Sequence, residues 1–233
     1  MKKTKKEKPE KFDTNAAKAC NNSGIDKGQA GYYKAAIRDF DKAIKLDPEY
    51  APAYINRGNA KHLLGDYKGA IEDCIKAIEL DPKAAAAYNN LGNAKGALGD
   101  CRAAIKDYDT AIRLNPKDAQ YYCNRGTARF AMEDYAGAIE DCTRATELDP
   151  KYADAYHNIG SAKERLGDYK GAVEYFTKTI ELNPELARAY CNRGIVKYKL
   201  GDKQAAVEDL NMAAKMGHAG AYEIIREIKG IEN

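Results

Sequence analysis

The 233-residue chain lacks the sequence features of a membrane-spanning protein, a metalloprotein or a phosphate-binding enzyme. No apolar run approaches the roughly 18 residues that a membrane span requires. The six cysteines form no Cys-x-x-Cys pair, and the only histidines are His62, His157 and His218. A glycine-rich phosphate loop, a nucleophile elbow and a His-Glu-x-x-His segment are all missing. We therefore predict that the chain is not an enzyme and has no catalytic residue, metal ligand or cofactor.

A large charge of one sign is also missing. The formal net charge is +3, and residues 1–16 alone hold six lysines, which leaves 32 of the 38 basic and 32 of the 35 acidic side chains in residues 17–233. A neutral body lacks the phosphate-neutralising surface of a nucleic-acid binder, so no nucleic acid partner is predicted. Residues 1–16 are predicted to be a disordered basic arm, with a nuclear-import signal or contact with an anionic membrane as alternatives.

The sequence shows no sign of export. The basic N-terminus is followed by polar sequence instead of the apolar core of a signal peptide. The cysteines are interpreted as small apolar residues in a reducing compartment. We therefore expect a cytoplasmic chain without a membrane span, although removal of a leader would leave the same sequence.

The chain has only seven prolines, but five of them recur every 34 residues, and each of the five follows Asp or Asn. A fixed period of this length is the signature of a repeat architecture. Because Asp or Asn caps a helix and proline suits its first turn, each dipeptide is predicted to open a helix. The dipeptides are Asp47-Pro48, Asp81-Pro82, Asn115-Pro116, Asp149-Pro150 and Asn183-Pro184.

Six repeats follow from this period. Each has Gly at position 8 and Ala at position 20, and the larger side chains at positions 4 and 24 complement them. Gly160 and Ala172, for example, share a repeat with Tyr156 and Phe176. Small residues opposite large ones fill the space between closely packed helices. The predicted repeats span residues 17–50, 51–84, 85–118, 119–152, 153–186 and 187–220.

A short turn divides each repeat from the second onward into two helices. Four repeats carry Leu-Gly-Asp there, in which Gly ends the first helix and Asp caps the second. Around the turns, apolar residues recur at helical intervals, and no segment alternates like a strand. The turns lie at 64–66, 98–100, 166–168 and 200–202, with Met132-Glu133-Asp134 in the fourth repeat.

The third repeat shows the family resemblance most fully. Tyr88-Asn89-Asn90-Leu91-Gly92, Leu98-Gly99-Asp100, Ala104-Ile105 and Leu114-Asn115-Pro116 resemble the tetratricopeptide motif. The resemblance covers about residues 17–220. It implies an all-α fold, a right-handed α-α superhelix of antiparallel helix pairs, whose first helices line a concave groove for a protein or peptide. It is specific for the fold and only weakly specific for function.

The two ends of the repeat array depart from the motif. The first helix of repeat one contains Gly24, Gly28 and Gly31, so it is predicted to fray first and could support weak self-association. At the other end, residues 221–233 are predicted to form an amphipathic capping helix, because Ile224, Ile225 and Ile228 stand beside charged residues.

One polar column runs through all six first helices. An Asn amide can hydrogen-bond a peptide backbone in both directions. Similar Asn ladders line the repeats of O-linked sugar transferases, a resemblance that implies binding of an extended segment. The alternative is that these amides satisfy neighbouring backbone groups. The column consists of Asn22, Asn56, Asn90, Asn124, Asn158 and Asn192 at position 6, and Asn59 and Asn93 lie on the same face at position 9.

Other polar positions of the first helices favour structural roles. The carboxylate clamp of chaperone-binding relatives needs cations where this chain has Gln120 and Asn124, so a clamp is not predicted. A metal site of Cys123, His157 and Cys191 is rejected, since first helices cannot approach closer than about 8–10 Å. The arginines of position 7 are expected to extend their charged ends to solvent along an apolar surface, to pair with a nearby Asp, or to mark anionic contacts. They are Arg57, Arg125 and Arg193.

These observations predict a non-enzymatic scaffold or adaptor that binds a peptide segment of a partner protein in the concave groove. The alternative is a targeting or regulatory module of a larger enzyme or chaperone assembly. Single-stranded RNA binding fits poorly, because the period is a strict 34 residues and the body is neutral.

Overall fold

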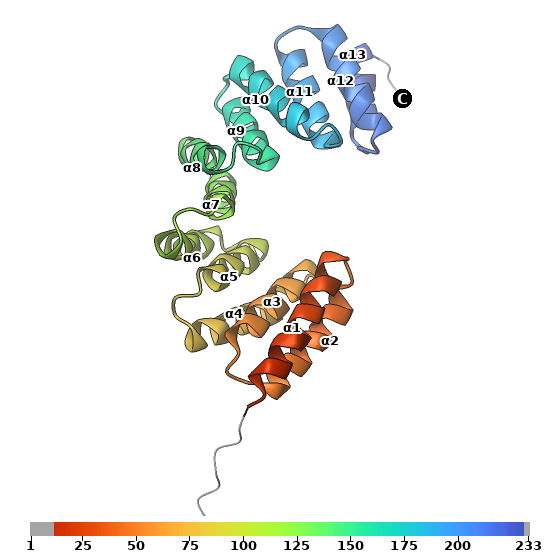
Figure 1. Ribbon diagram of the computed structural model, residues 1–233. Coiled ribbons are helices and arrows are strands. Elements are labelled where there is room, and N and C mark those ends of the chain that lie inside the picture. Colours follow the sequence, from red (N-terminus) through yellow and green to blue (C-terminus); the bar gives the residue numbers. More distant parts are fainter. Residues whose placement is uncertain (1–11, 231–233) are drawn as a thin grey trace, which may run out of the picture. The chain divides into compact units, whose positions relative to one another are not determined.

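The computed structural model describes residues 12–230 of the chain (Figure 1). All regular structure in this range is helical. Most of the predicted basic arm and the end of the predicted capping segment lie outside the described residues. The helices are α1 (Thr14–Gln29), α2 (Tyr33–Leu46), α3 (Ala51–Leu63), α4 (Tyr67–Leu80), α5 (Ala85–Ala97), α6 (Cys101–Leu114), α7 (Ala119–Ala131), α8 (Tyr135–Leu148), α9 (Ala153–Arg165), α10 (Tyr169–Leu182), α11 (Ala187–Lys199), α12 (Lys203–Lys215) and α13 (Ala221–Lys229).

The chain divides into two compact units, with the boundary between Asp100 and Cys101. In the first unit, α1 packs on α2 and α3 on α4, while α5 packs against α4. In the second, the pairs are α7 with α8, α9 with α10, and α11 with α12. Successive first helices also contact one another: α3 packs against α1 and α5, and α9 packs against α7 and α11. The predicted all-α class and its helix pairs are confirmed.

The turn within each repeat follows the predicted chemistry. Gly65 adopts φ +82°, and the Asp66 N–H donates to the Lys61 carbonyl over 2.9 Å, which closes the end of α3. The Asp66 carboxylate then accepts from the Gly69 N–H at 3.0 Å and caps α4. Glu133 is the exception, because it is the one described residue other than glycine with positive φ, at 64°.

The Asp-Pro and Asn-Pro dipeptides do not open helices, and the prediction that they do is wrong. Asp47 follows the last residue of α2 in extended conformation, and α3 begins only at Ala51. The Asp47 carboxylate accepts from the Glu49 N–H at 3.0 Å, so the dipeptide forms a turn between repeats. The residue before a proline disfavours helical dihedrals, which explains the break at this point. The same side-chain bond recurs at Asp81, Asn115, Asp149 and Asn183.

The first helix starts earlier than the repeat boundary suggests. The predicted disordered arm includes residues 14–16, but α1 begins at Thr14. The Asp13 carboxylate caps it by accepting from the Ala16 N–H at 3.0 Å, and the Thr14 hydroxyl donates to Asp47 at 2.7 Å. The cap, together with this contact to the turn after α2, starts α1 three residues before the predicted repeat boundary at residue 17.

Small residues bring the two helices of a repeat together, as the columns predict. A Cβ added at Gly126 would lie 3.2 Å from the Ala138 carbonyl oxygen and 2.7 Å from the Cys142 Sγ. At Gly160 it would lie 2.8 Å from the Phe176 ring. The Ala side chains of position 20 are at most 1% exposed, so each repeat interface is closely packed.

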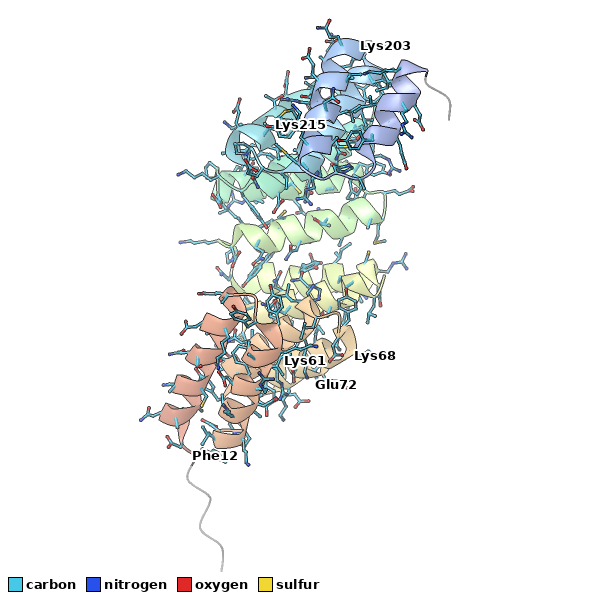
Figure 2. The ribbon with its side chains drawn as sticks, turned by 90° about the vertical axis from the view of Figure 1, so that its right-hand side faces the viewer. Phe12, Lys61, Lys68, Glu72, Lys203 and Lys215 are labelled. Carbon is cyan, nitrogen blue, oxygen red and sulfur yellow. The ribbon has the colours of Figure 1, made fainter. Side chains whose placement is uncertain are left out.

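The C-terminal helix covers the last repeat. Ala221, Ile225 and Ile228 of α13 are buried and belong to the same apolar cluster as Leu210 of α12. Tyr222 instead stays 59% exposed. Figure 2 labels Lys203 and Lys215, the first and last residues of α12. Among residues 12–230, no helix has the length and apolar character needed to cross a bilayer.

Candidate functional site

A cleft in the first unit lies on α1, α2 and α3. We call it the N-terminal cleft, and its volume is about 450 Å³. Asn56 and Asn59, two predicted site residues, lie in its wall. None of its lining side chains carries a charge at neutral pH. They are Ile25, Gly28, Gln29, Tyr33, Phe40, Asn56, Asn59, Ala60 and Leu63.

A second cleft, the C-terminal cleft, is lined entirely by three first helices of the second unit. Its volume is about 370 Å³. The predicted Asn158 and Asn192 lie in its wall, but several charged and aromatic residues do too. The lining residues are Thr127 and Phe130 of α7, His157, Asn158, Ser161, Glu164 and Arg165 of α9, and Arg188 and Asn192 of α11.

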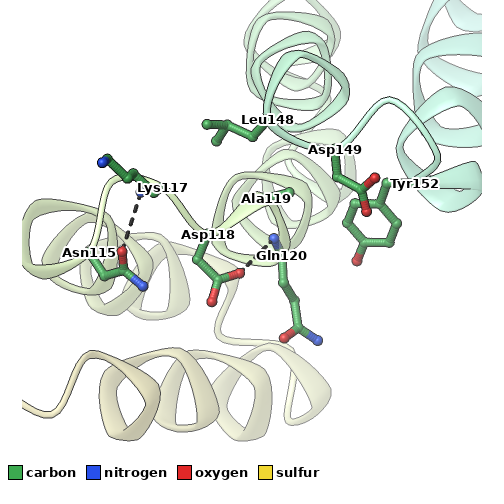
Figure 3. A pocket seen from close by; sticks show the side chains of 8 residues that line it. All are labelled: Asn115, Lys117, Asp118, Ala119, Gln120, Leu148, Asp149 and Tyr152. Carbon is green, nitrogen blue, oxygen red and sulfur yellow. Dashed lines mark hydrogen bonds between the residues drawn. The ribbon is translucent and has the colours of Figure 1, made fainter.

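A third hollow, of about 510 Å³, lies at the turns that precede α7 and α9 (Figure 3). Its polar side chains serve the turns. The Asp118 carboxylate accepts from the Gln120 N–H at 3.0 Å, and Asn115 accepts from the Lys117 N–H at 3.4 Å. None of the predicted site residues lines this hollow. We therefore assign Asp118 to the capping of α7, and Asn115 and Asp149 to the turns between repeats.

The position 6 asparagines reach back to the preceding first helix. Asn56 Nδ2 donates to Asn21 Oδ1 at 2.9 Å, and Asn90 Nδ2 donates to the Ile55 carbonyl at 3.4 Å. Asn158 Nδ2 donates to the Thr127 hydroxyl at 3.0 Å. Part of the amide chemistry is therefore structural, as the alternative interpretation of the column stated. One such bond occupies one N–H and leaves the rest of the amide to other partners. Asn158 Nδ2 makes a second bond of this kind, to Cys123 Sγ at 3.4 Å.

The predicted asparagines do not all lie in the clefts. Asn56, Asn59, Asn158 and Asn192 line them, whereas Asn90, Asn93 and Asn124 line neither. Asn22 is exposed on α1, and the other members of the position 6 column are half-buried. The predicted asparagines thus divide into four that line a cleft and three that line neither.

His157 lies between the cleft and the core. It is 6% exposed, and its ring packs on Phe176 with centroids 5.3 Å apart. Burial, with the nearby Arg188 charge, lowers its pKa to about 4, so the imidazole is neutral at pH 7. Asn192 Nδ2 lies 3.4 Å from its Nε2. Across the described part of the chain, no three His, Cys, Asp or Glu side chains lie close enough to share a metal ion.

The position 7 arginines form ion pairs inside the protein. Arg125 binds both Asp141 oxygens through Nε and Nη2, at 2.9 and 2.5 Å, and its Nη1 lies 2.6 Å from Asp109 of the preceding repeat. Its guanidinium also lies 5.8 Å from the Tyr122 ring centroid. We call this arrangement an arginine clip. Arg57 forms the same clip with Asp73 and Asp41, and Arg193 forms one with Asp209 and Thr177.

The clips decide between the two interpretations of these arginines. Asp73 and Asp141 are at most 3% exposed, and a bidentate guanidinium supplies the charge-assisted bonds that a buried carboxylate needs. Burial alone would lower the pKa of Arg57, but its hydrogen bonds to Asp73 and Asp41 outweigh this and raise it. The arginines are therefore structural ties between a repeat and its predecessor.

Sequence reasoning missed most of the charged and aromatic cleft residues. Arg188, Asn192 and Ser161 occupy positions 2, 6 and 9 of their repeats, and Arg165 occupies position 13. Residues spaced by three or four share one helix face. Following that face beyond position 9 would have found Arg165 at position 13 of the fifth repeat. It would also have found Phe130, at position 12 of the fourth repeat.

Family models match most of the chain. The models, all described as tetratricopeptide or TPR repeats, match residues 29–65, 51–84, 89–153, 153–186 and 187–216. Two of these segments, 51–84 and 153–186, have the same bounds as the second and fifth predicted repeats. A sequence search of curated proteins found no match.

Solved structures resemble the chain over most of its length. MamA is 29% identical, with a TM-score of 0.62, over 71% of this chain and 96% of that chain. YrrB, described as a TPR protein with an unusual peptide-binding site, is 26% identical with a TM-score of 0.63, over 82% of this chain and 98% of that one. The type IV pilus biogenesis factor PilW shares the fold at 20% identity and a TM-score of 0.82, over 90% and 97%. With its paired helices and the matching family models, the chain belongs to the tetratricopeptide repeat family.

Proposed function

We propose that the chain is a non-catalytic interaction scaffold that binds an extended peptide segment of a partner protein on its first helices. The observation that carries this proposal is the position of the clefts. First helices of successive repeats line both clefts, and two of the asparagines predicted to bind a peptide lie in the wall of each. The similarity to YrrB, a TPR protein described with a peptide-binding site, supports the same function.

The chemistry of the clefts suits a peptide. Asn amides can bind backbone groups whatever side chains the peptide carries, while apolar and aromatic walls accept side chains. Phe40 and Tyr33 supply such a wall in the N-terminal cleft, and Phe130 does so in the C-terminal cleft. Specificity would then come from the residues around the asparagines.

Binding can be tested with the full chain and a displayed library of random peptides. Selected peptides are synthesised, and their affinity is measured for the wild type and for the Asn158→Ala, Asn192→Ala double variant. Because a hydrogen bond contributes about 1 kcal/mol, removing two should weaken peptides bound at the C-terminal cleft by roughly tenfold or more. The Asn56→Ala, Asn59→Ala variant tests the N-terminal cleft in the same way.

Asn211→Ala is the matched control, since Asn211 is exposed on the second helix α12 and lines neither cleft. Its affinities should equal those of the wild type. Circular dichroism checks that every variant keeps its helix content, because Asn158 also bonds within the protein. Unchanged affinities in both cleft variants would refute the proposed binding site.

A further inference from the structure

The two clefts differ in charge. The N-terminal cleft has no charged lining residue, whereas Glu164, Arg165 and Arg188 all line the C-terminal cleft. Two of these three are neutralised within the chain. Glu164 accepts from Lys199 Nζ at 2.7 Å, and Arg188 pairs with Asp154. Arg165 remains as the charge without a partner of opposite sign among residues 12–230.

Arg165 is held in place by aromatic rings. Its guanidinium carbon lies 5.0 Å from the Tyr135 ring centroid and 5.9 Å from that of Phe130. Such cation–π contacts orient a guanidinium without neutralising it. Its planar fork of N–H donors remains suited to a carboxylate, which it can bind through two parallel bonds.

The next repeat contains a complete version of the same arrangement. Lys199 occupies the position 34 residues after Arg165, and its Nζ lies 5.4 Å from the Tyr169 ring centroid, as Arg165 lies over Tyr135. Lys199 also has a carboxylate partner, Glu164. The residue equivalent to Glu164 one repeat earlier is Phe130. Arg165 therefore has the aromatic support of Lys199 but lacks its carboxylate.

We propose that the C-terminal cleft selects an acidic side chain, Asp or Glu, of the bound segment, and that Arg165 binds its carboxylate in the role that Glu164 fills for Lys199. This inference rests on the proposed function, because it specifies the peptide that the scaffold binds. The hydroxyl of Ser161 and the amide of Asn158, which share the cleft wall, add uncharged hydrogen-bonding groups near this position.

The test uses a library of random eight-residue peptides embedded between constant neutral flanks, so that side chains are the only variable carboxylates. The full chain, the Arg165→Gln variant and the Arg102→Gln variant are used for selection in parallel. Arg102 is exposed at the start of α6 and lines neither cleft, so its loss changes net charge equally. Asp and Glu should be enriched several-fold at one peptide position with the wild type and Arg102→Gln, and not with Arg165→Gln.

A second variant supplies the missing carboxylate from within. Phe130→Glu copies the residue that stands at this position in the following repeat, so it should pair with Arg165 and abolish the acidic preference. For one selected peptide, replacing its acidic residue by the matching amide should weaken binding to the wild type about tenfold. The same replacement should change binding to Arg165→Gln less than twofold.

The outcomes separate this inference from the proposed function. If the wild type enriches no peptides at all, the proposed function fails. If it enriches peptides without an acidic position, or if the acidic preference survives in Arg165→Gln, the inference is overturned while the scaffold function stands. Variants that lose helix content by circular dichroism are replaced by Arg165→Lys, which keeps the charge and should keep a weaker acidic preference.

Discussion

At the scale of single residues, Glu133 carries a conformational cost that its counterparts avoid. It adopts φ 64° in a turn where Gly65, Gly99, Gly167 and Gly201 stand in the other repeats. A left-handed residue other than glycine costs roughly 1–2 kcal/mol, part of which glycine returns through its greater freedom in the unfolded chain. We expect Glu133→Gly to raise the free energy of unfolding by about 1 kcal/mol.

Urea denaturation of the two proteins measures this difference as a shift of the midpoint with an unchanged slope. Gly167→Glu is the matched control. An added Cβ there meets nothing within 4 Å, so only the φ of +81° opposes it. It should destabilise the chain by a similar amount. A destabilised Glu133→Gly variant would contradict the argument.

His157 should make stability depend on pH. Its pKa is lowered by burial to about 4, below the ordinary value of 6.5, so between these values the unfolded chain binds a proton that the folded chain does not. Stability then falls as pH falls through this window, by about 2 kcal/mol between pH 7 and pH 5. Asp154, which opposes the lowering, and Arg188, which adds to it, are the charged neighbours.

Unfolding by urea at pH 7 and pH 5 tests this expectation in the wild type and in His157→Asn. Asparagine already occupies the equivalent buried position at Asn89. The variant should lose most of the 2 kcal/mol difference, while His62, whose pKa burial also lowers, retains its smaller share. An equal pH dependence in both proteins would remove His157 as its source.

At the scale of helices and their contacts, each arginine clip joins the two helices of its own repeat to the second helix of the preceding repeat. Removing Arg125 alone leaves the buried Asp141 with only Arg129, 3.1 Å away. Breaking a buried ion pair in this way costs about 3–5 kcal/mol. In the fifth repeat, the positions equivalent to Arg125 and Asp141 hold Ile159 and Tyr175, which pack together in an apolar cluster.

We therefore expect Arg125→Ile to destabilise the chain by about 3 kcal/mol and Arg125→Ile with Asp141→Tyr to recover most of that loss. A double-mutant cycle from urea unfolding measures the coupling between the two positions, which should exceed 1 kcal/mol. Additive effects of the two substitutions would mean that the clip contributes nothing beyond its separate residues.

The helices and their internal turns could be predicted from sequence because their signals are local. Gly65 and Asp66, for example, act within one turn of the chain. The prediction for Asp47-Pro48 is wrong because the same residues can cap a helix or close a turn, and only the conformation of the neighbouring residues decides between the two. The partners of Asn158, and the grouping of Arg165 with Phe130, depend on contacts between helices about 35 residues apart. Such contacts follow from packing and leave no local signal.

At the scale of the whole molecule, stability should be a sum of neighbour contacts, because each described helix packs mainly on adjacent ones. Removing residues 221–233 would expose Leu210 and its apolar cluster on α12. We expect amide hydrogen exchange to lose at least tenfold protection in α11 and α12 while α1 and α2 keep theirs. Equal loss in α1 and α2 would show that the chain unfolds as one cooperative body.

The arginine clips also have a mechanical consequence. Arg57, Arg125 and Arg193 tie the first repeat to the second, the third to the fourth and the fifth to the sixth. The boundary between the fourth and fifth repeats has no clip, because position 7 of the fifth repeat is Ile159. On its two sides lie α7 and α9, two of the three helices that line the C-terminal cleft. Bending at the boundaries held by Arg57 and Arg125 stretches short ionic hydrogen bonds, whereas bending between α7 and α9 deforms apolar contacts and the uncharged bond from Asn158 to Thr127. We therefore expect the boundary between α7 and α9 to bend more easily than the boundaries held by Arg57 and Arg125, so that the width of the C-terminal cleft can change there.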